Sequence, residues 1–465
     1  MSILPKETSK RNVLLSSYQG FARRSTVETL VIMIALIFAA GTFTYQLAGE
    51  SPMLPPALAG QTSTSTQIVR GVAYLAIIMV CLQSSHSIIA ILKRSTPLTF
   101  LVFLAMISAT WSPDPVGTVR KATALMLTLF TGICLAAHYP GFSSIRIVLR
   151  TYVVMLTLSV IVVVVAPRYG IHQVTDGFQS SHAGQWRGIF VHRTLLGQMA
   201  GFSAAILISC GSHLIRARGI LVTSIAISLL CLVMANSGGG YLTFSLVLLT
   251  YFIIKNFPKS MSHGEYALLF AIAAFVVLPM LVYHDDLIQL ILSALGKETT
   301  LTGRTPIWQS IVLLWQQRPL LGYGFSLGFS KIILPYIETT LNTGYVPNAQ
   351  NGYLQALICL GLVGLMATLW MLWVALRRSF SAARYTHGLH LAPLLVCIYF
   401  IQVNFVEDWL VEEHNPALIL FATVFAAVAS MDVRQPSSVS STLRRFQPRG
   451  LLMQPREYES QRHLR

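Results

Sequence analysis

Long apolar runs separated by short polar segments fill most of the chain. Twelve of these runs approach or reach the roughly 17–25 residues that a transmembrane helix needs. They lie near residues 27–48, 67–92, 97–112, 119–138, 148–166, 194–212, 220–235, 241–254, 266–283, 353–376, 388–405 and 416–431. Most connections are short and favour antiparallel helical hairpins, so the pattern predicts an all-α polytopic membrane protein with about 12 transmembrane helices.

The same pattern divides the chain into five parts. Basic, polar tails occupy residues 1–26 and 432–465, and two groups of apolar runs occupy residues 27–283 and 353–431. Between these groups lies the polar segment 284–352, which is too long to be a simple connection. Loops of that length are usually functional.

Part of this long segment has the pattern of a helix. Thr305 followed by Pro306 is typical of a helix start, and Ile307, Ile311 and Leu314 then recur at helical spacing. The predicted helix ends near residue 317 and carries two tryptophans, which favour a position at the membrane interface.

Composition supports a membrane protein and excludes two other classes. Only 11% of the residues are charged and 54% are hydrophobic, whereas soluble domains carry about 25% charged residues. A soluble enzyme and a disordered chain are therefore excluded. All six cysteines fall in apolar runs without a CxxC pair, so we interpret them as core residues and expect no metal site.

The net charge of +16 is explained by topology. If the N-terminus is cytoplasmic, the cytoplasmic segments hold 23 of the 33 Lys and Arg residues but only 6 of the 17 acidic residues. Such an asymmetry orients membrane proteins. It predicts that both termini are cytoplasmic, that the first run is an uncleaved signal anchor, and that nucleic acid is not a partner.

Three polar segments converge on the opposite, outer face. They are residues 167–193, 284–352 and 407–416, and the last holds four carboxylates and His414. The same face carries six arginines, whose guanidinium groups bind phosphate oxygens bidentately: Arg120, Arg168, Arg187, Arg193, Arg304 and Arg318. A lipid-linked diphosphate would suit them, although interfacial anchoring or pairing with acidic residues would explain them equally well.

At these positions the chain resembles the family of O-antigen ligases and exopolysaccharide repeat-unit polymerases. The resemblance covers roughly residues 100–370, and its most specific block is GRTPIW at 303–308 followed by RPLLGYG at 318–324. Further similar stretches are NGYLQ at 351–355, GLVG at 361–364, WSPDP at 111–115 with Arg120, and GIFVHR at 188–193 with Leu196 and Gly197.

The resemblance implies a metal-independent inverting glycosyltransferase at the periplasmic face of the bacterial inner membrane. Its donor would be an undecaprenyl-diphosphate-linked oligosaccharide, and its acceptor either a growing polysaccharide or lipid A-core. Absence of nucleotide-sugar, P-loop and metal motifs agrees with such a donor, and no cofactor is expected. Other polysaccharide export proteins are further candidate partners.

Two departures from the family pattern favour a polymerase of exopolysaccharide or capsular repeats over a ligase. The family has His before the motif Asn, but this chain has Gln350, and an amide cannot act as a general base. Many members also carry an Arg where residues 236–240 read NSGGG. That glycine run would either offer backbone N–H groups to a phosphate or form a helix junction.

For the chemistry, Arg304 is the first candidate to stabilise the leaving diphosphate. The candidate general bases are His192 and Glu407, for which a structural His and a salt-bridged carboxylate are the alternatives. No role is assigned to His414, Asp285 or Asp286. The candidate substrate-binding residues are Arg120, Arg187, Arg193, Arg318, Gln350, Asn351 and Tyr353.

A transporter or flippase of lipid-linked glycans is the rival from another functional class. Transporters place ionisable residues near the bilayer midplane and show paired, broken helices. Here the centres of the apolar runs are nearly free of charge and no internal repeat is found. The charges on one face therefore favour an enzyme, while a structural partner of an export machine stays an alternative.

Overall fold

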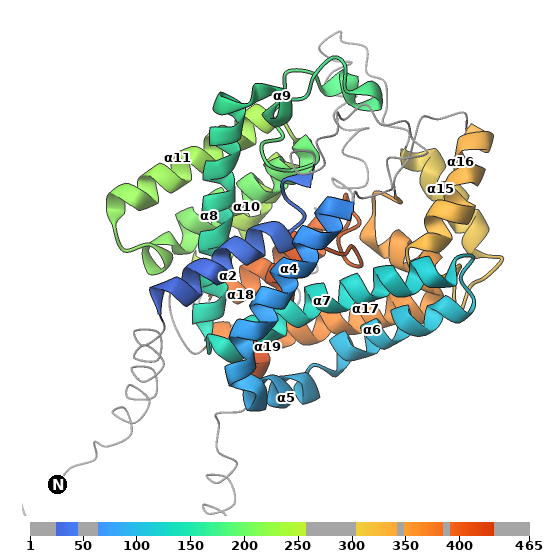
Figure 1. Cartoon of the computed structure of the whole chain (residues 1–465), viewed down its shortest axis with the longest axis horizontal. Helices are drawn as coiled ribbons and strands as arrows, with labels where there is room; N and C mark the ends of the chain where they lie inside the picture. The colour runs from blue at the N-terminus through green and yellow to red at the C-terminus, as the bar shows by residue number, and fades with distance from the viewer. Residues whose placement is uncertain (1–24, 45–63, 257–303, 342–347, 385–390, 432–465) are drawn as a thin grey trace, which may run out of the picture.

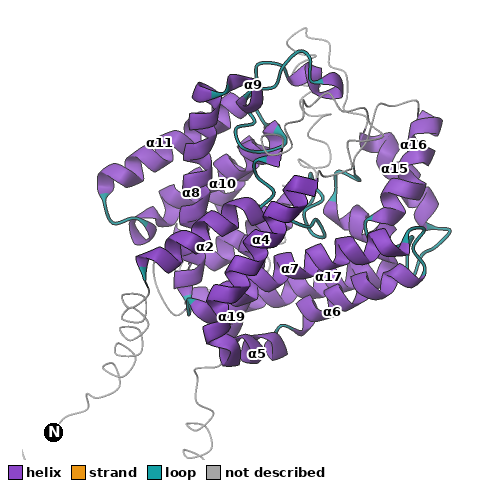
Figure 2. Ribbon diagram, in the orientation of Figure 1, coloured by secondary structure: helices purple, strands orange, loops and turns teal. Residues whose placement is uncertain are grey.

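The structure is a computed structural model that describes residues 25–44, 64–256, 304–341, 348–384 and 391–431. Regular structure in these residues is helical, and the one strand-like feature among them is a bridge between Ile171 and Trp186. Figures 1 and 2 show the helices gathered into one bundle, with α15 and α16 at one end of it. This confirms the predicted all-α fold class.

The helices follow one another along the chain with short connections. Their bounds are α2 Thr26–Ala39, α4 Thr64–Cys81, α5 Ser85–Arg94, α6 Thr96–Ile107, α7 Pro115–His138, α8 Phe142–Val165, α9 Pro167–Gly170, α10 Arg193–Leu214, α11 Arg218–Ala235, α12 Gly238–Asn256, α15 Arg304–Trp315, α16 Leu334–Leu341, α17 Gly352–Arg384, α18 Ala392–Val403 and α19 Pro416–Met431. Short 3₁₀ turns lie at Leu82–Ser84, Ser108–Thr110 and Gly177–His182, and a π turn at Phe329–Ile333.

Eleven of the twelve predicted runs coincide with helices, and the run at 266–283 lies outside the described residues. Seven helices among the described residues are long and apolar enough to cross a membrane. Five further apolar helices are shorter, α2, α18 and α19 among them. The protein is therefore an integral membrane protein with several transmembrane helices.

Several helix starts are capped by polar side chains. Asp114 accepts a hydrogen bond from the Gly117 amide at 2.9 Å before α7, and Asn415 accepts one from the Ala417 amide at 2.8 Å before α19. Such caps satisfy amide groups that the first helical turn leaves without partners. Polar residues are therefore required where these helices leave the apolar layer.

The ends of these helices lie together on one face of the bundle. The Phe43 amide after α2 donates to the Ile189 carbonyl before α10 at 2.8 Å, and the Gly352 amide of α17 donates to the Asn404 carbonyl after α18, also at 2.8 Å. We call this the outer face because it carries the three polar segments predicted to converge.

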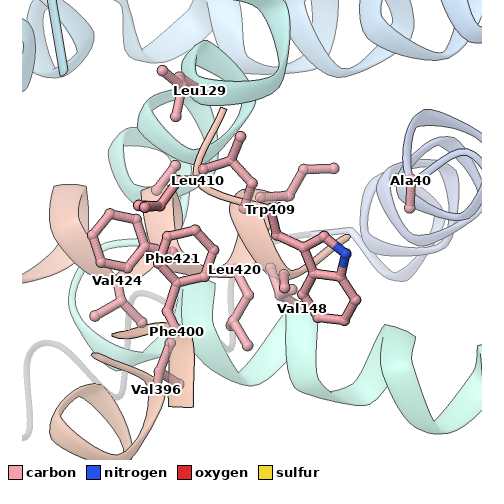
Figure 3. Packing of buried hydrophobic residues seen from close by; sticks show 14 of the residues in the cluster. Ala40, Leu129, Val148, Val396, Phe400, Trp409, Leu410, Leu420, Phe421 and Val424 are labelled. Atoms are coloured by element: carbon pink, nitrogen blue, oxygen red, sulfur yellow. The ribbon is translucent and has the colours of Figure 1, made fainter. Parts of the chain in front are cut away.

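The centre of the bundle is built around α19, which is buried along almost its whole length. Phe421 of α19 stacks on Phe400 of α18 with ring centroids 4.4 Å apart. Figure 3 shows these rings with Trp409 and Leu410, which belong to the loop between the two helices. Burial of these apolar side chains fixes the loop that joins α18 to α19.

The glycine run at 236–240 forms a helix junction. Asn236 ends α11 in a left-handed conformation, and Gly238 begins α12. Gly201 of α10 packs so closely on Gly240 that a Cβ atom on Gly201 would lie 2.3 Å from the Gly240 carbonyl oxygen. The glycines therefore allow close contact between α10 and α12, as small residues do between membrane helices.

Helix α17 is broken at Gly361, whose φ of 66° is outside the helical region. The Leu362 amide instead donates a hydrogen bond to the Pro319 carbonyl of a neighbouring turn, at 2.8 Å. From the same turn, the Gly324 amide donates to the Cys359 carbonyl at 2.8 Å. Two of the family-like stretches, 318–324 and 361–364, are thus joined through their backbones.

Candidate functional site

Two of the three polar segments meet at the start of α15. The Trp308 indole donates to the Ala349 carbonyl at 2.9 Å, and the Asn348 amide donates to the Asp408 carboxylate at 2.9 Å. The Asn351 amide also donates to the Phe405 carbonyl at 3.3 Å. These bonds hold α15, the turn at 348–351 and the loop after α18 in one unit.

Arg304, the first residue of α15, lies close enough to Glu407 for its charge to act on that carboxyl group. Its Nε is buried and has no hydrogen-bond partner among the described residues. Arg304 also forms no ion pair with the described residues, because none of their carboxylate oxygens lies within 4.0 Å of its guanidinium. Leaving a buried donor unpaired is costly, so the Nε of Arg304 is a candidate donor to an anionic ligand.

Burial raises the pKa of Glu407 to about 7, and the charge of Arg304 opposes part of that rise. The carboxyl group is therefore near its titration point at neutral pH. A base or acid is most effective when its pKa lies near the operating pH. Arg304 and Glu407, both predicted to be catalytic, are brought together by the fold.

Two further carboxyl groups of the same loop are also buried. Burial and the charge of Glu407 raise the pKa of Asp408 to about 7, and burial and the charge of Asp408 raise that of Glu412 to about 8. Glu412 also accepts a hydrogen bond from the Asn415 amide at 2.6 Å. Between these carboxyl groups the loop is anchored by buried Trp409 and Leu410.

Glu413, at the end of this loop, forms an ion pair with Lys121 of α7. Burial opposes ionisation of Glu413, but the charge and hydrogen bond of Lys121 outweigh it, so the pKa of Glu413 is lowered. Beside this pair, the His414 ring shares a 2.9 Å hydrogen bond with the Tyr74 hydroxyl. Burial and the charge of Arg70 lower the pKa of His414 to about 3.

Sequence reasoning missed Lys121 and Arg70. Lys121 follows Arg120 directly, and the structure leaves Arg120 exposed while Lys121 faces the acidic loop. Arg70 lies within an apolar run, and a charge in such a run is a candidate functional residue. That signal was present in the sequence and would have found Arg70.

The third polar segment, 167–193, holds a cluster of three histidines. The ring centroids of His172, His182 and His192 lie 5.2–5.9 Å apart. Burial, followed by neighbouring positive charges, lowers the pKa of His172 and His192 to about 3. No His, Cys, Asp and Glu group in the described part of the chain has a geometry that would hold a metal ion.

His192 also caps α10, since its Nδ1 accepts a hydrogen bond from the Thr194 amide at 3.2 Å. The segment is held elsewhere by bonds to α8 and to the end of α11. The Ile189 amide donates to the Ser159 hydroxyl at 3.3 Å, and the Trp186 amide donates to the Met234 carbonyl at 3.0 Å. His192 therefore has a structural role at the start of α10.

The arginines of this segment differ in their availability. Arg187 is fully buried, and its guanidinium donates to Asp176 at 3.0 Å and to the Tyr169 carbonyl at 2.8 Å. Arg193 donates to the Asn236 carbonyl, but its Nε is buried without a partner among the described residues. Arg187 thus holds the segment together, whereas Arg193 retains a free donor.

Of the other predicted binding residues, Arg318 follows the end of α15, and Gln350, Asn351 and Tyr353 lie around the start of α17. Arg318 is exposed and lies over the Tyr323 ring, 5.1 Å from its centroid. Gln350 has a φ of 49° in the turn before α17. The side-chain Oδ1 of Asn351 caps α17 by accepting a hydrogen bond from the Tyr353 amide at 3.0 Å, and the Tyr353 hydroxyl donates to the Ile401 carbonyl at 2.8 Å. Asp285 and Asp286 lie outside the described residues.

The sequence of this chain is similar to one known protein family and to one characterised relative. Residues 223–369 match a family described as O-antigen ligase. The chain is also similar to the exopolysaccharide production protein ExoQ of Rhizobium meliloti (strain 1021), at 28% identity over 147 residues. That similarity covers 29% of this chain and 33% of the relative, so it spans about a third of the relative's length. Both findings show that part of this chain, residues 223–369 in the family match, is similar to O-antigen ligases and to an exopolysaccharide production protein.

Proposed function

We propose that this protein polymerises lipid-linked oligosaccharide repeat units into an exopolysaccharide or capsular polysaccharide. The observation that carries the proposal is the buried, unpartnered Nε of Arg304 beside Glu407. A guanidinium with an unpartnered N–H, within electrostatic reach of a titratable carboxyl group, suits a reaction in which a phosphate leaves and a hydroxyl attacks. The name of the similar exopolysaccharide production protein supports this substrate class.

In the proposed reaction, the acceptor hydroxyl forms a bond to the anomeric carbon of the donor sugar. The bond from that carbon to the diphosphate oxygen breaks, and the undecaprenyl diphosphate leaves with the electron pair. Negative charge develops on the leaving oxygen, and a preorganised donor aimed at such charge contributes about 10²–10³ in rate. Arg304 is that donor in the proposed reaction.

Glu407 is the better candidate for the base that takes the hydroxyl proton. Its pKa of about 7 means that it is partly ionised at neutral pH, whereas the pKa of His192, at about 3, makes that imidazole a weak base. The charge of Arg304 also acts on Glu407, while His192 belongs to the histidine cluster. We therefore assign His192 to capping α10 and Glu407 to proton transfer.

The proposed setting is the bacterial inner membrane, with both termini cytoplasmic and the outer face in the periplasm. The charge asymmetry of the chain supports this orientation. Carboxyl and guanidinium groups gather on that one face, which suits a surface reaction better than passage of a substrate through the bilayer. This argues against a transporter of the same lipid-linked glycans.

Transfer of the glycan to lipid A-core, as an O-antigen ligase would do, is the second candidate. The match of residues 223–369 to the O-antigen ligase family favours it. Gln350, at the position where the family has His, favours the polymerase. The two reactions share a donor and differ only in the acceptor.

A strain that lacks this gene tests the proposal, complemented with the wild type, Arg304→Ala or the exposed control Arg168→Ala. Polysaccharide and lipid-linked glycans are extracted and sized. Loss of long polymer in the Arg304→Ala strain, with single repeats accumulating on undecaprenyl diphosphate at the periplasmic leaflet, supports the polymerase. Polymer that stays on the lipid carrier instead indicates the ligase. Repeats held at the cytoplasmic leaflet contradict both and indicate transport.

A further inference from the structure

The turn that precedes α17 holds Gln350 in an unusual backbone conformation. Its φ of 49° lies in the left-handed region, which residues other than glycine rarely adopt. Such a conformation persists only where the surrounding structure holds it, and it is frequent at functional sites. The side chain of Gln350 is half-buried. The contacts that fix this backbone therefore decide where the carboxamide of Gln350 is presented.

Asn348 uses both groups of its side-chain amide to fix this turn. Its Oδ1 accepts a hydrogen bond from the backbone amide of Gln350 at 3.0 Å, and its Nδ2 donates to the Oδ1 of Asp408 at 2.9 Å. The oxygen meets a donor and the nitrogen meets an acceptor, so a flipped side-chain amide would lose both bonds. Asp408 is only 8% exposed and belongs to the loop between α18 and α19. That loop thus anchors the turn through Asn348.

Ala349, in the middle of this turn, is held from two further sides. Its amide donates to the Oε1 of Gln355 in α17 at 3.0 Å, and its carbonyl accepts a hydrogen bond from the Trp308 indole of α15 at 2.9 Å. Trp308 follows Arg304 by four residues, so the two side chains project from one face of the helix. The turn is therefore tied to the face of α15 that carries Arg304.

From these contacts we propose that Asn348 is a positioning residue, which Asp408 holds in place and which presents the side chain of Gln350 to the substrate. The inference rests on the proposed function, because that reaction supplies the substrate. Asp408 then serves as the acceptor for the Asn348 amide and not as a second base, although it follows Glu407 directly. Loss of either bond should misplace Gln350, and a displacement of about 1 Å can cost about 10² in rate.

Exchanging the two side chains tests this directly in the full-length protein in proteoliposomes, with an undecaprenyl-diphosphate-linked repeat unit as donor. Asn348→Asp sets one carboxylate against another and should lower kcat/KM by about 10². Asp408→Asn keeps an acceptor for the Asn348 amide and should lower kcat/KM by at most about tenfold, since only the charge assistance is lost. Asn256→Asp, at the exposed end of α12, is the matched control and should change nothing.

The double variant Asn348→Asp/Asp408→Asn gives the decisive result. In it, the new amide at 408 donates to the new carboxylate at 348, which still accepts from the Gln350 amide. We expect its kcat/KM to return to within about threefold of that of Asp408→Asn. A double variant as slow as Asn348→Asp, or one that does not fold, would overturn the proposal. If Asn348→Asp alone does not fold, a folded and active double variant supports it.

A second measurement separates the positioning of the turn from the reaction. The tryptophans are replaced by 5-fluorotryptophan, and the ¹⁹F resonance of Trp308 is assigned by its loss in Trp308→Phe. This resonance should shift or broaden in Asn348→Asp and return to its wild-type position in the double variant. An unchanged resonance in Asn348→Asp would overturn the proposal even if turnover falls. If the wild type turns over no donor while the resonance follows the expected pattern, the proposed reaction fails and the positioning by Asn348 stands.

Discussion

At the scale of single residues, the site depends on groups whose charge is set by burial. The charge of Arg304 acts on Glu407, no ion pair joins the two among the described residues, and the Arg304 Nε has no hydrogen-bond partner there. The sequence predicted both residues, because an arginine in a family-like stretch and a carboxylate at the end of an apolar run are recognisable. It could not predict Lys121, whose role follows only from contact with Glu413, a residue far along the chain.

Glu407 predicts the pH dependence of turnover. Because its pKa is raised to about 7, the carboxyl group is protonated below that pH and cannot accept a proton. We expect kcat to rise as the pH increases from 6 to 8. In Glu407→Gln, kcat should be lower by about 10²–10⁴ and should no longer rise with pH over this range. His192→Asn should keep the rise of kcat with pH. If His192→Asn removes this rise and Glu407→Gln does not, the base has been assigned to the wrong residue.

Glu412 predicts the pH dependence of stability. The pKa of Glu412 is raised from its ordinary value of 4.5 to about 8 in the folded protein, so folding favours the protonated carboxyl group. The stabilisation is complete below pH 4.5 and is lost as the pH rises through 8. Thermal unfolding in detergent should therefore show a Tm that falls between pH 5 and pH 9. Glu412→Gln keeps an acceptor for Asn415 and should show a smaller fall. An unchanged fall in that variant would mean that other groups cause it.

At the scale of elements, the spacing of apolar residues predicted most helices but not their interruptions. The helical spacing of Ile307, Ile311 and Leu314 predicted a helix over 305–317, and the structure has α15 there. The break in α17 was not predicted, because residues 353–376 form one continuous apolar run. That break depends on partners from the turn at 319–324, and hydrogen bonds to a distant segment leave no periodic signal.

Gly361 should therefore be sensitive to the smallest substitution. A Cβ atom there would lie 2.2 Å from the Leu320 backbone, and the φ of 66° is unfavourable for any other residue. We expect Gly361→Ala to destabilise the protein by at least about 1–3 kcal/mol, measured as a lowered Tm in detergent. Gly71→Ala is the control, since nothing lies within 4 Å of its added Cβ atom and alanine favours a helix. Equal Tm values for the two variants would contradict the strained break.

At the scale of the whole molecule, the helix ends on one face bring distant polar segments together. The sequence predicted that three segments share this face, because an even number of crossings separates them. It could not predict which of them meet. In the structure, 304–352 and 407–416 form the unit around Arg304, whereas hydrogen bonds from 167–193 run to α8 and to the end of α11.

The orientation of the whole molecule is open to a labelling experiment. The six cysteines are buried, so a membrane-impermeant maleimide should leave the wild type unlabelled. In intact spheroplasts, Thr175→Cys on the outer face should be labelled, and Ala217→Cys on the opposite face only after the membrane is opened. The reverse pattern would place the Arg304 site in the cytoplasm and contradict a periplasmic reaction.

The most direct test of the account is turnover by the purified full-length protein in proteoliposomes. The donor is an undecaprenyl-diphosphate-linked repeat unit, and free undecaprenyl diphosphate and glycan length are measured together. We predict that the two rise in step for the wild type and for Arg168→Lys, while Arg304→Lys, which keeps the charge but loses the bidentate fork, is about 10²–10³ slower. Full activity of Arg304→Lys, or release of the lipid carrier without a longer glycan, would contradict the central role of this arginine in glycan transfer.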